Sequence, residues 1–174
     1  MKLKYKILIF TVPAVFLLDQ ITKWMIVNLL PLGERIAIIP GFFDIVHFRN
    51  LGAAFGMFSG VPDVLRIPFF YIIAVVATVA LAFMYRALCA GERLLPFALS
   101  LVFGGIAGNV LDRVRFGAVI DFLSFHIRDK AVDSVIFGYR FNVPLEWPAF
   151  NVADAAITIA VALVVITAIK RSEK

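Results

Sequence analysis

Charged residues are scarce in this chain. Only 17% of its 174 residues are Asp, Glu, Lys or Arg, whereas 62% are hydrophobic, and the mean hydropathy is +0.96. A soluble domain of this length needs more polar surface than these residues can supply. The composition therefore excludes a soluble globular protein. It predicts an integral membrane protein that forms one domain over residues 1–174.

Cysteine is almost absent, since Cys89 stands alone. A single cysteine excludes an internal disulfide and a thiolate metal cluster. The chain also lacks His-Glu-x-x-His, Gly-x-Ser-x-Gly and a Gly-rich phosphate loop before a helix. His47 and His126 are isolated in the sequence, and we expect them to be loop residues rather than metal ligands. The sequence thus predicts neither a metal nor a cofactor.

Long apolar stretches are what the chain has in abundance. About 20 apolar residues cross a bilayer as a helix, and four such windows occur, at approximately Ile7–Val27, Ile67–Tyr85, Leu94–Val114 and Val152–Ile169. The first window resembles a secretory signal peptide, but a small-x-small cleavage site is missing and apolar residues resume up to Leu30. We therefore expect an uncleaved first transmembrane helix. Gly104 and Gly108 form a Gly-x-x-x-Gly face that predicts close packing of the third helix.

Basic residues are concentrated on one side of these four spans. Short segments at the two ends and between the second and third spans carry Lys2, Lys4, Lys6, Arg86, Arg93, Lys170, Arg171 and Lys174. Such short basic segments face the cytoplasm. Both termini are then cytoplasmic, and the two long loops, about Leu29–Pro62 and Arg115–Pro148, lie outside. The net charge of +5 accordingly indicates topology and contact with anionic membrane lipids, not nucleic-acid binding.

Two segments in the outer loops have the composition of β-strands, Phe42–Arg49 and Ser134–Val143. Open sheet edges cannot face lipid. We therefore expect these strands to lie at the outer surface, as one small sheet. The predicted fold class is an all-α integral membrane protein with four transmembrane helices and a small extracytoplasmic β element.

Two aspartates stand next to the third and fourth spans, Asp121 in Val-Ile-Asp-Phe and Asp154 in Phe-Asn-Val-Ala-Asp. Ionisable groups at membrane depth are costly and are functional candidates by default. Two carboxyl groups held together share one proton, which is the basis of aspartic protease chemistry. At about 1.5 Å rise per residue, Asp19 and Asn109 lie in the same outer layer, so three helices bring polar groups to one depth.

Each polar group also has a purely structural interpretation. Asp19 and Lys23 are spaced i,i+4 and match an intrahelical ion pair. Arg113 has the length to extend its charge to the interface. Asn151 and Asp154 fit the N-cap and the N3 acid of a helix, a role compatible with catalysis.

Five segments, taken together and in order, resemble the motifs of the lipoprotein signal peptidase (signal peptidase II) family. They are Asp19-Gln20-Ile21-Thr22-Lys23, Asn50-Leu51-Gly52-Ala53-Ala54-Phe55, the stretch from Gly104 to Arg113, Val119-Ile120-Asp121-Phe122 and Phe150-Asn151-Val152-Ala153-Asp154. Each motif alone is weak, but five in order on four spans are specific.

The resemblance implies an aspartic endopeptidase of the bacterial cytoplasmic (inner) membrane. Such an enzyme removes signal peptides from prolipoproteins, cutting before a cysteine that already carries diacylglyceryl. The resemblance also implies a multi-pass protein with its site near the outer face, no metal, and inhibition by cyclic peptide antibiotics. It makes Asp121 and Asp154 the catalytic dyad. It assigns binding or supporting roles to Asp19, Lys23, Asn50, Gly52, Asn109, Asp112, Arg113 and Asn151.

One segment departs from the family pattern, because Ile127–Glu146 is longer than the usual connection between the two aspartates. Its apolar and aromatic side chains predict that it rests on the outer interface beside the site, where it either contacts substrate or only packs as a β-ribbon. These side chains are Val135, Ile136, Phe137, Tyr139 and Phe141.

Two other function classes compete with the peptidase. In a small proton-coupled transporter or channel, intramembrane Asp and Arg would line a path, but four spans without internal repeats argue against it. A structural membrane subunit leaves the two aspartates unexplained. Cleavage of a lipidated peptide by the detergent-solubilised protein separates these classes, since only the peptidase performs it.

The distribution of basic residues generates a topology prediction. Reporter fusions placed after Lys174 and within Ser134–Tyr139 should report opposite sides of the membrane, the first cytoplasmic and the second external. Fusion reporters that are active on only one side measure this directly. If both fusions report the same side, a span has been miscounted.

Overall fold

The computed structural model describes residues 2–52, 58, 60–89, 91–136 and 139–172, with the backbone alone for 128–136 and 139–145. Within these residues lie four helices, α1 (Leu3–Leu29), α2 (Asp63–Ala87), α3 (Leu94–Phe116) and α4 (Val152–Ser172). Each is long and apolar enough to cross a membrane. The four predicted spans are confirmed.

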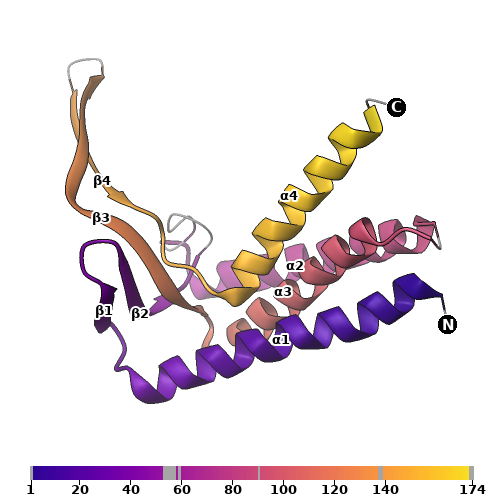
Figure 1. Cartoon of the computed structure of the whole chain (residues 1–174). Helices are drawn as coiled ribbons and strands as arrows, with labels where there is room; N and C mark the ends of the chain where they lie inside the picture. The colour runs from indigo at the N-terminus through magenta and orange to yellow at the C-terminus, as the bar shows by residue number, and fades with distance from the viewer. Residues whose placement is uncertain (1, 53–57, 59, 90, 137–138, 173–174) are drawn as a thin grey trace.

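The predicted β element is an antiparallel sheet in the order β1-β2-β3-β4. Its strands are β1 (Arg35–Ile39), β2 (Phe43–Asn50), β3 (Val119–Ile136) and β4 (Tyr139–Glu146). The first part of β3 pairs with β2, and its second part pairs with β4, as a hairpin that extends away from the helices (Figure 1). The expected strand Phe42–Arg49 is confirmed as β2. The expected segment Ser134–Val143 is divided between the end of β3 and the start of β4. The long segment between the aspartates is therefore this hairpin, with residues 137–138 outside the described part.

Two expectations about the loops need correction. His47 lies in β2 and His126 in β3, so neither is a loop residue. The two strands pair with each other from Phe43 to Asn50, with a register shift between Ile45 and Phe48. The strand β3 begins at Val119, only two residues after the C-cap Gly117 of α3 (φ 67°). Glycine adopts this left-handed conformation without steric cost, so α3 turns directly into the strand that carries Asp121.

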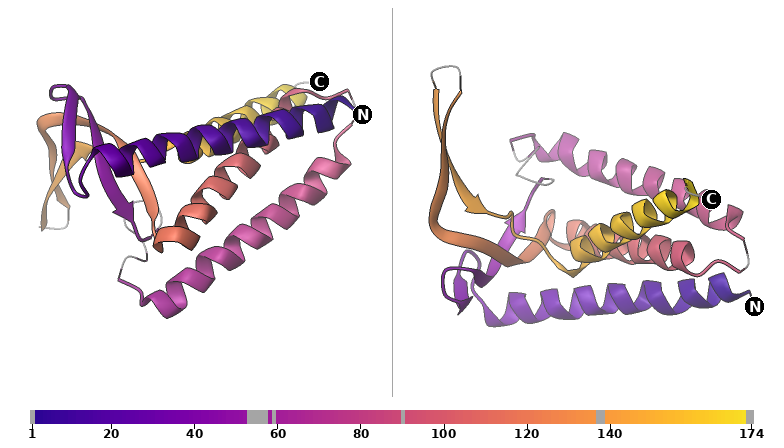
Figure 2. Two further views of the ribbon diagram at one scale, coloured as in Figure 1. Left: turned by 90° about the horizontal axis from the view of Figure 1, so that it is seen from below. Right: turned by 45° about the horizontal axis from the view of Figure 1, so that its top comes forward.

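The helix α3 is the centre of the bundle (Figures 1 and 2). A Cβ atom on Gly104 would lie 2.7 Å from Cβ of Val15 on α1, and one on Gly108 would collide with the Asp19 carboxylate. Gly105 faces α4, where a Cβ would lie 2.7 Å from the carbonyl oxygen of Ala153. Small residues thus bring α1 and α4 close to α3, as the Gly-x-x-x-Gly spacing predicts.

The helices α1 and α2 lie far apart at the end of the bundle near the sheet. They come together at the opposite end, near the two chain termini (Figure 2). At that end the buried Lys4 ammonium donates hydrogen bonds to the carbonyl oxygens of Tyr85 (3.3 Å), Arg86 (3.0 Å) and Leu88 (2.7 Å). The hydroxyl of Tyr85 donates in return to the carbonyl of Lys4. The last carbonyls of a helix have no intrahelical donor, so Lys4 caps α2 and joins it to α1.

This cap generates a stability prediction. Lys4→Met should lower the free energy of unfolding by about 1–3 kcal/mol, because the carbonyl oxygens of α2 lose a charged donor in a buried place. Lys6→Met removes an equal charge from an exposed position two residues away and should change it by less than about 0.5 kcal/mol. Thermal unfolding of the purified variants in detergent compares the two. If both variants lower the stability equally, the positive charge near the N-terminus stabilises the protein, and the hydrogen bonds of Lys4 to α2 do not.

Candidate active site

Asp121 and Asp154 reach the site from different elements, the third residue of β3 and the first turn of α4. Asn151 stands directly before α4. Its side-chain oxygen accepts the backbone N–H of Asp154 (2.9 Å), and the Asp154 carboxylate accepts the backbone N–H of Asn151 (3.3 Å). This reciprocal pair is a capping box. The predicted N-cap and N3 acid are therefore both present.

Three asparagine amides hold the two carboxyl groups. Asn151 Nδ2 donates to Asp121 Oδ1 (2.8 Å), and Asn50 Nδ2 donates to Asp121 Oδ2 (3.0 Å). Asn109 Nδ2 donates to Asp154 Oδ1 (2.8 Å). Because Asn151 binds one carboxyl through its amide and the other through its cap, a single residue connects Asp121 to Asp154.

The two carboxyl groups differ in their surroundings. Asp121 is only 3% exposed, whereas Asp154 is half-buried. Burial raises the pKa of Asp121 to about 7, and the negative charge of Asp154 adds to this rise, against the opposing hydrogen bonds from Asn50 and Asn151. Burial therefore favours the protonated form of Asp121 at a higher pH than for an exposed aspartate.

A buried ionic cluster of three side chains lies next to these residues. Lys23 Nζ lies 2.9 Å from Asp19 Oδ2 and 2.7 Å from Asp112 Oδ2, and all three residues are at most 1% exposed. Gln20 joins the cluster by donating to Asp19 and to Asp112, each at 3.1 Å. Lys23 also donates to Asn109 Oδ1 (3.1 Å). The pair Asp19–Lys23 is thus part of a network between α1 and α3, and not merely an intrahelical ion pair.

Each acid of this cluster also holds the backbone next to one of the two aspartates. Asp19 Oδ1 accepts the backbone N–H of Ala153 (2.9 Å), and Asp112 Oδ2 accepts that of Ile120 (3.1 Å). Ala153 and Ile120 directly precede Asp154 and Asp121 in the chain. The cluster consequently fixes the positions of the two carboxyl-bearing segments relative to each other.

Arg113 lies at the side of the site that faces α2. Its guanidinium donates to the carbonyl oxygens of Gly52 (3.0 Å) and Asn109 (3.4 Å), and it stacks 4.2 Å from the ring centroid of Phe70. The backbone N–H of Gly52 in turn donates to Asn50 Oδ1 (3.0 Å). Arg113 is therefore held by two carbonyl oxygens and an aromatic ring. A side chain that only extends its charge to the membrane interface would not need these contacts. The remaining residues of this loop motif, Ala53 to Phe55, lie outside the described part of the chain.

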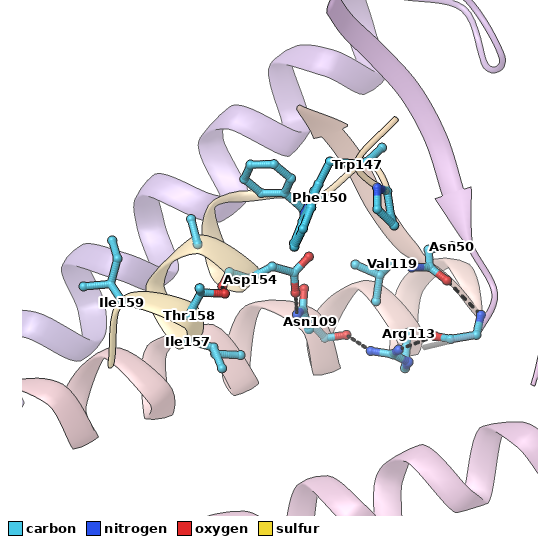
Figure 3. A pocket seen from close by; sticks show the side chains of 14 residues that line it. Asn50, Asn109, Arg113, Val119, Trp147, Phe150, Asp154, Ile157, Thr158 and Ile159 are labelled. Atoms are coloured by element: carbon cyan, nitrogen blue, oxygen red, sulfur yellow. Dashed lines mark hydrogen bonds between the residues drawn. The ribbon is translucent and has the colours of Figure 1, made fainter. Parts of the chain in front are cut away.

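A cavity of about 590 Å³ opens beside Asp154 (Figure 3). Asn109, Arg113 and Asp154 supply its polar groups, and Ile157, Thr158 and Ile159 extend it along α4. Trp147 and Phe150 stand over it near Asn50 and Val119 (Figure 3). Asp121 does not line this cavity but contacts Asn50, which does. The site thus combines paired carboxyl groups with a mainly apolar binding surface.

The structure brings together all ten residues that the sequence selected and adds others, among them Gln20, Phe70 and Phe150. These three were not selected as site residues, since no charge marks them; for Gln20 and Phe150 the available signal was their place in the quoted motifs. The expected contacts of the long hairpin remain a prediction, because Phe137 lies outside the described residues and the structure gives only the backbone of Val135, Ile136, Tyr139 and Phe141. Among described residues no three His, Cys, Asp or Glu form a metal-binding group.

Comparison with known proteins gives consistent matches over most of the chain. Residues 11–170 match the family model described as signal peptidase (SPase) II. The lipoprotein signal peptidase of Syntrophotalea carbinolica is 42% identical over 94% of this chain and 91% of its own length. That of Geobacter sulfurreducens is 37% identical over 100% of this chain and 98% of its own.

A solved structure agrees with the same assignment. It is a bacterial membrane enzyme that is 34% identical to this chain, with a TM-score of 0.76, and the match covers 95% of this chain and 88% of that enzyme. The fold, the sequence matches and the family model all support the same family. This chain belongs to the signal peptidase II family.

Proposed function

We propose that this protein is an aspartic endopeptidase that removes signal peptides from diacylglyceryl-modified prolipoproteins, cutting just before the lipidated cysteine. The family and the names of its relatives support the peptidase class and the lipoprotein substrates. The observation that carries the aspartic mechanism is the pair of carboxyl groups joined through Asn151, one of them with a pKa near 7.

The two carboxyl groups take different roles in the first step. Both oxygens of Asp154 accept hydrogen bonds at the start of α4, where the helix dipole stabilises an anion. Ionised Asp154 removes a proton from the water that attacks the scissile carbonyl carbon. Protonated Asp121 donates its proton to the carbonyl oxygen, giving a neutral tetrahedral diol.

The second step reverses these roles. The proton taken up by Asp154 passes to the amide nitrogen, the C–N bond breaks, and Asp121 regains a proton from the diol hydroxyl. The products are the free carboxylic end of the signal peptide and the amino group of the lipidated cysteine. No bond of this sequence requires a metal or a cofactor.

The surroundings of the carboxyl groups suit a substrate that is itself embedded in the membrane. The cavity extends along apolar residues of α4, which offer a surface to the signal helix and to acyl chains. Arg113, Asn50 and Gly52 provide polar contacts at its other side. In our proposal the protein is multi-pass in the bacterial inner membrane, with cytoplasmic termini and the site near the outer face. A cyclic peptide antibiotic would compete for this cavity.

Replacing either aspartate tests the dyad. Asp121→Asn and Asp154→Asn should each lower kcat for a lipidated prolipoprotein by on the order of 10³ or more, because an amide neither takes up nor releases a proton. Turnover by the purified proteins in detergent measures this. Glu34→Gln, which neutralises an exposed carboxylate of the outer loop, is the matched control and should retain full activity.

Thermal unfolding of the same samples separates chemistry from folding. Both Asn variants should unfold near the wild-type temperature. A variant that folds and cleaves at a near-normal rate would remove its aspartate from the mechanism. Loss of activity in chelator, restored by zinc, would replace the aspartic mechanism with a metal-dependent one.

The raised pKa of Asp121 gives a pH prediction. Asp121 keeps its proton below about pH 7 and loses it above that value. The rate should therefore fall as pH rises through 7, approaching tenfold per pH unit. Asn50→Ala removes a hydrogen bond that lowers this pKa, so it should move the alkaline limb to higher pH. Profiles of kcat/KM against pH measure the alkaline limb for the wild type and for Asn50→Ala. A limb that moves to lower pH would contradict the assignment of the proton to Asp121.

A further inference from the structure

Trp147 is a large apolar side chain that the protein leaves uncovered. It is 64% exposed, yet its backbone is fixed, because its N–H donates to the carbonyl of Phe125 on β3 (2.8 Å). Phe150 is bound to β3 as well, through hydrogen bonds with Phe122 and Leu123. The segment from Trp147 to Phe150 is therefore tied to β3 at both ends, and the indole projects over the cavity beside Asp154 (Figure 3).

Two physical explanations account for such a tryptophan. Tryptophan is enriched where a membrane meets water, because its ring has an apolar body and one polar N–H. Alternatively, the exposed ring is a contact surface that a ligand covers. Trp24 on α1 is 63% exposed and does not line this cavity. It therefore provides a tryptophan of equal exposure outside the cavity beside Asp154.

The two ends of the cavity differ in what they can bind. One end follows Ile157 and Ile159 down α4, into the apolar depth of the membrane. The other end is formed by Trp147, Asn50 and Gly52, beside the outer sheet. Resting on the proposed function, a signal helix occupies the α4 end. The chain beyond the scissile bond then leaves the site past Trp147.

We propose that Trp147 is a specificity-determining residue that reads the first residues after the lipidated cysteine. The flat indole face packs against an apolar or aromatic side chain there and against little of a glycine. Contacts between aromatic rings contribute enough free energy for a difference of about three- to tenfold. This selectivity concerns the mature end of the substrate, and it is separate from recognition of the lipid and of the signal helix.

The test uses the full-length protein and lipidated substrates that differ only in the second residue after the cysteine, Phe, Leu or Gly. The kcat and KM values are measured for wild type, Trp147→Ala, Trp147→Phe and Trp24→Ala. Wild type should prefer Phe over Gly by about three- to tenfold in kcat/KM. Trp147→Ala should reduce this preference to less than about twofold, mainly by raising KM for the Phe substrate, while Trp147→Phe and Trp24→Ala keep it.

Each other outcome overturns the proposal in a recognisable way. If Trp147→Ala slows all substrates equally, or if Trp24→Ala has the same effect, Trp147 is an interface anchor. If Trp147→Ala does not fold, Trp147→Leu decides, since it keeps an apolar side chain but loses the ring and must still weaken the preference for Phe over Gly. Wild type that cleaves without any preference refutes only the role of Trp147. Wild type that cleaves no lipidated substrate refutes the proposed function as well.

Discussion

The site depends on one buried cation. Lys23 is 1% exposed and lies between Asp19 and Asp112. An ammonium group in such a place is tolerated only when opposite charges and hydrogen bonds surround it. The two acids also accept backbone N–H groups at Ala153 and Ile120. Removing the cation would leave two uncompensated carboxylates that hold α4 and β3 in place. The same three charged side chains therefore balance each other's charge and set the distance between the segments that carry Asp121 and Asp154.

Helix packing serves the same constraint. Gly108 of α3 faces the carboxylate of Asp19, and no larger residue leaves room for it. Its carbonyl oxygen accepts a hydrogen bond from Gln20 (3.2 Å). Gly105 permits an equally close approach of α4 at Ala153, the residue that Asp19 binds. The glycines thus bring the polar groups of three helices within hydrogen-bond distance in a region with little water. In the membrane, where apolar burial does not drive helices together, close packing and interhelical polar contacts supply this association.

Much of this arrangement was predictable from the sequence, and the exceptions have physical reasons. Hydropathy locates the four helices, and the cost of charge in an apolar chain marks Asp19, Asp121 and Asp154. The strand that carries Asp121 was not predicted, because the short run from Ala118 to Leu123 lacks the strict alternation of apolar and polar residues that marks a strand. Lys4 was interpreted as a topology signal, whereas it caps α2. From the sequence alone, a lysine that marks topology cannot be told from a lysine that caps another helix. Only the tertiary contacts distinguish the two roles.

The two carboxyl groups are unequal because the fold approaches them differently. Asp154 is on the first turn of a helix and lines the cavity, and the helix end stabilises its negative charge. Asp121 lies on a strand packed against β2, where burial favours the neutral acid. Asn151 hydrogen-bonds to both residues and so positions the two carboxyl groups relative to each other. In the proposed mechanism, the division of labour between a base and an acid follows from joining a helix start to a buried strand.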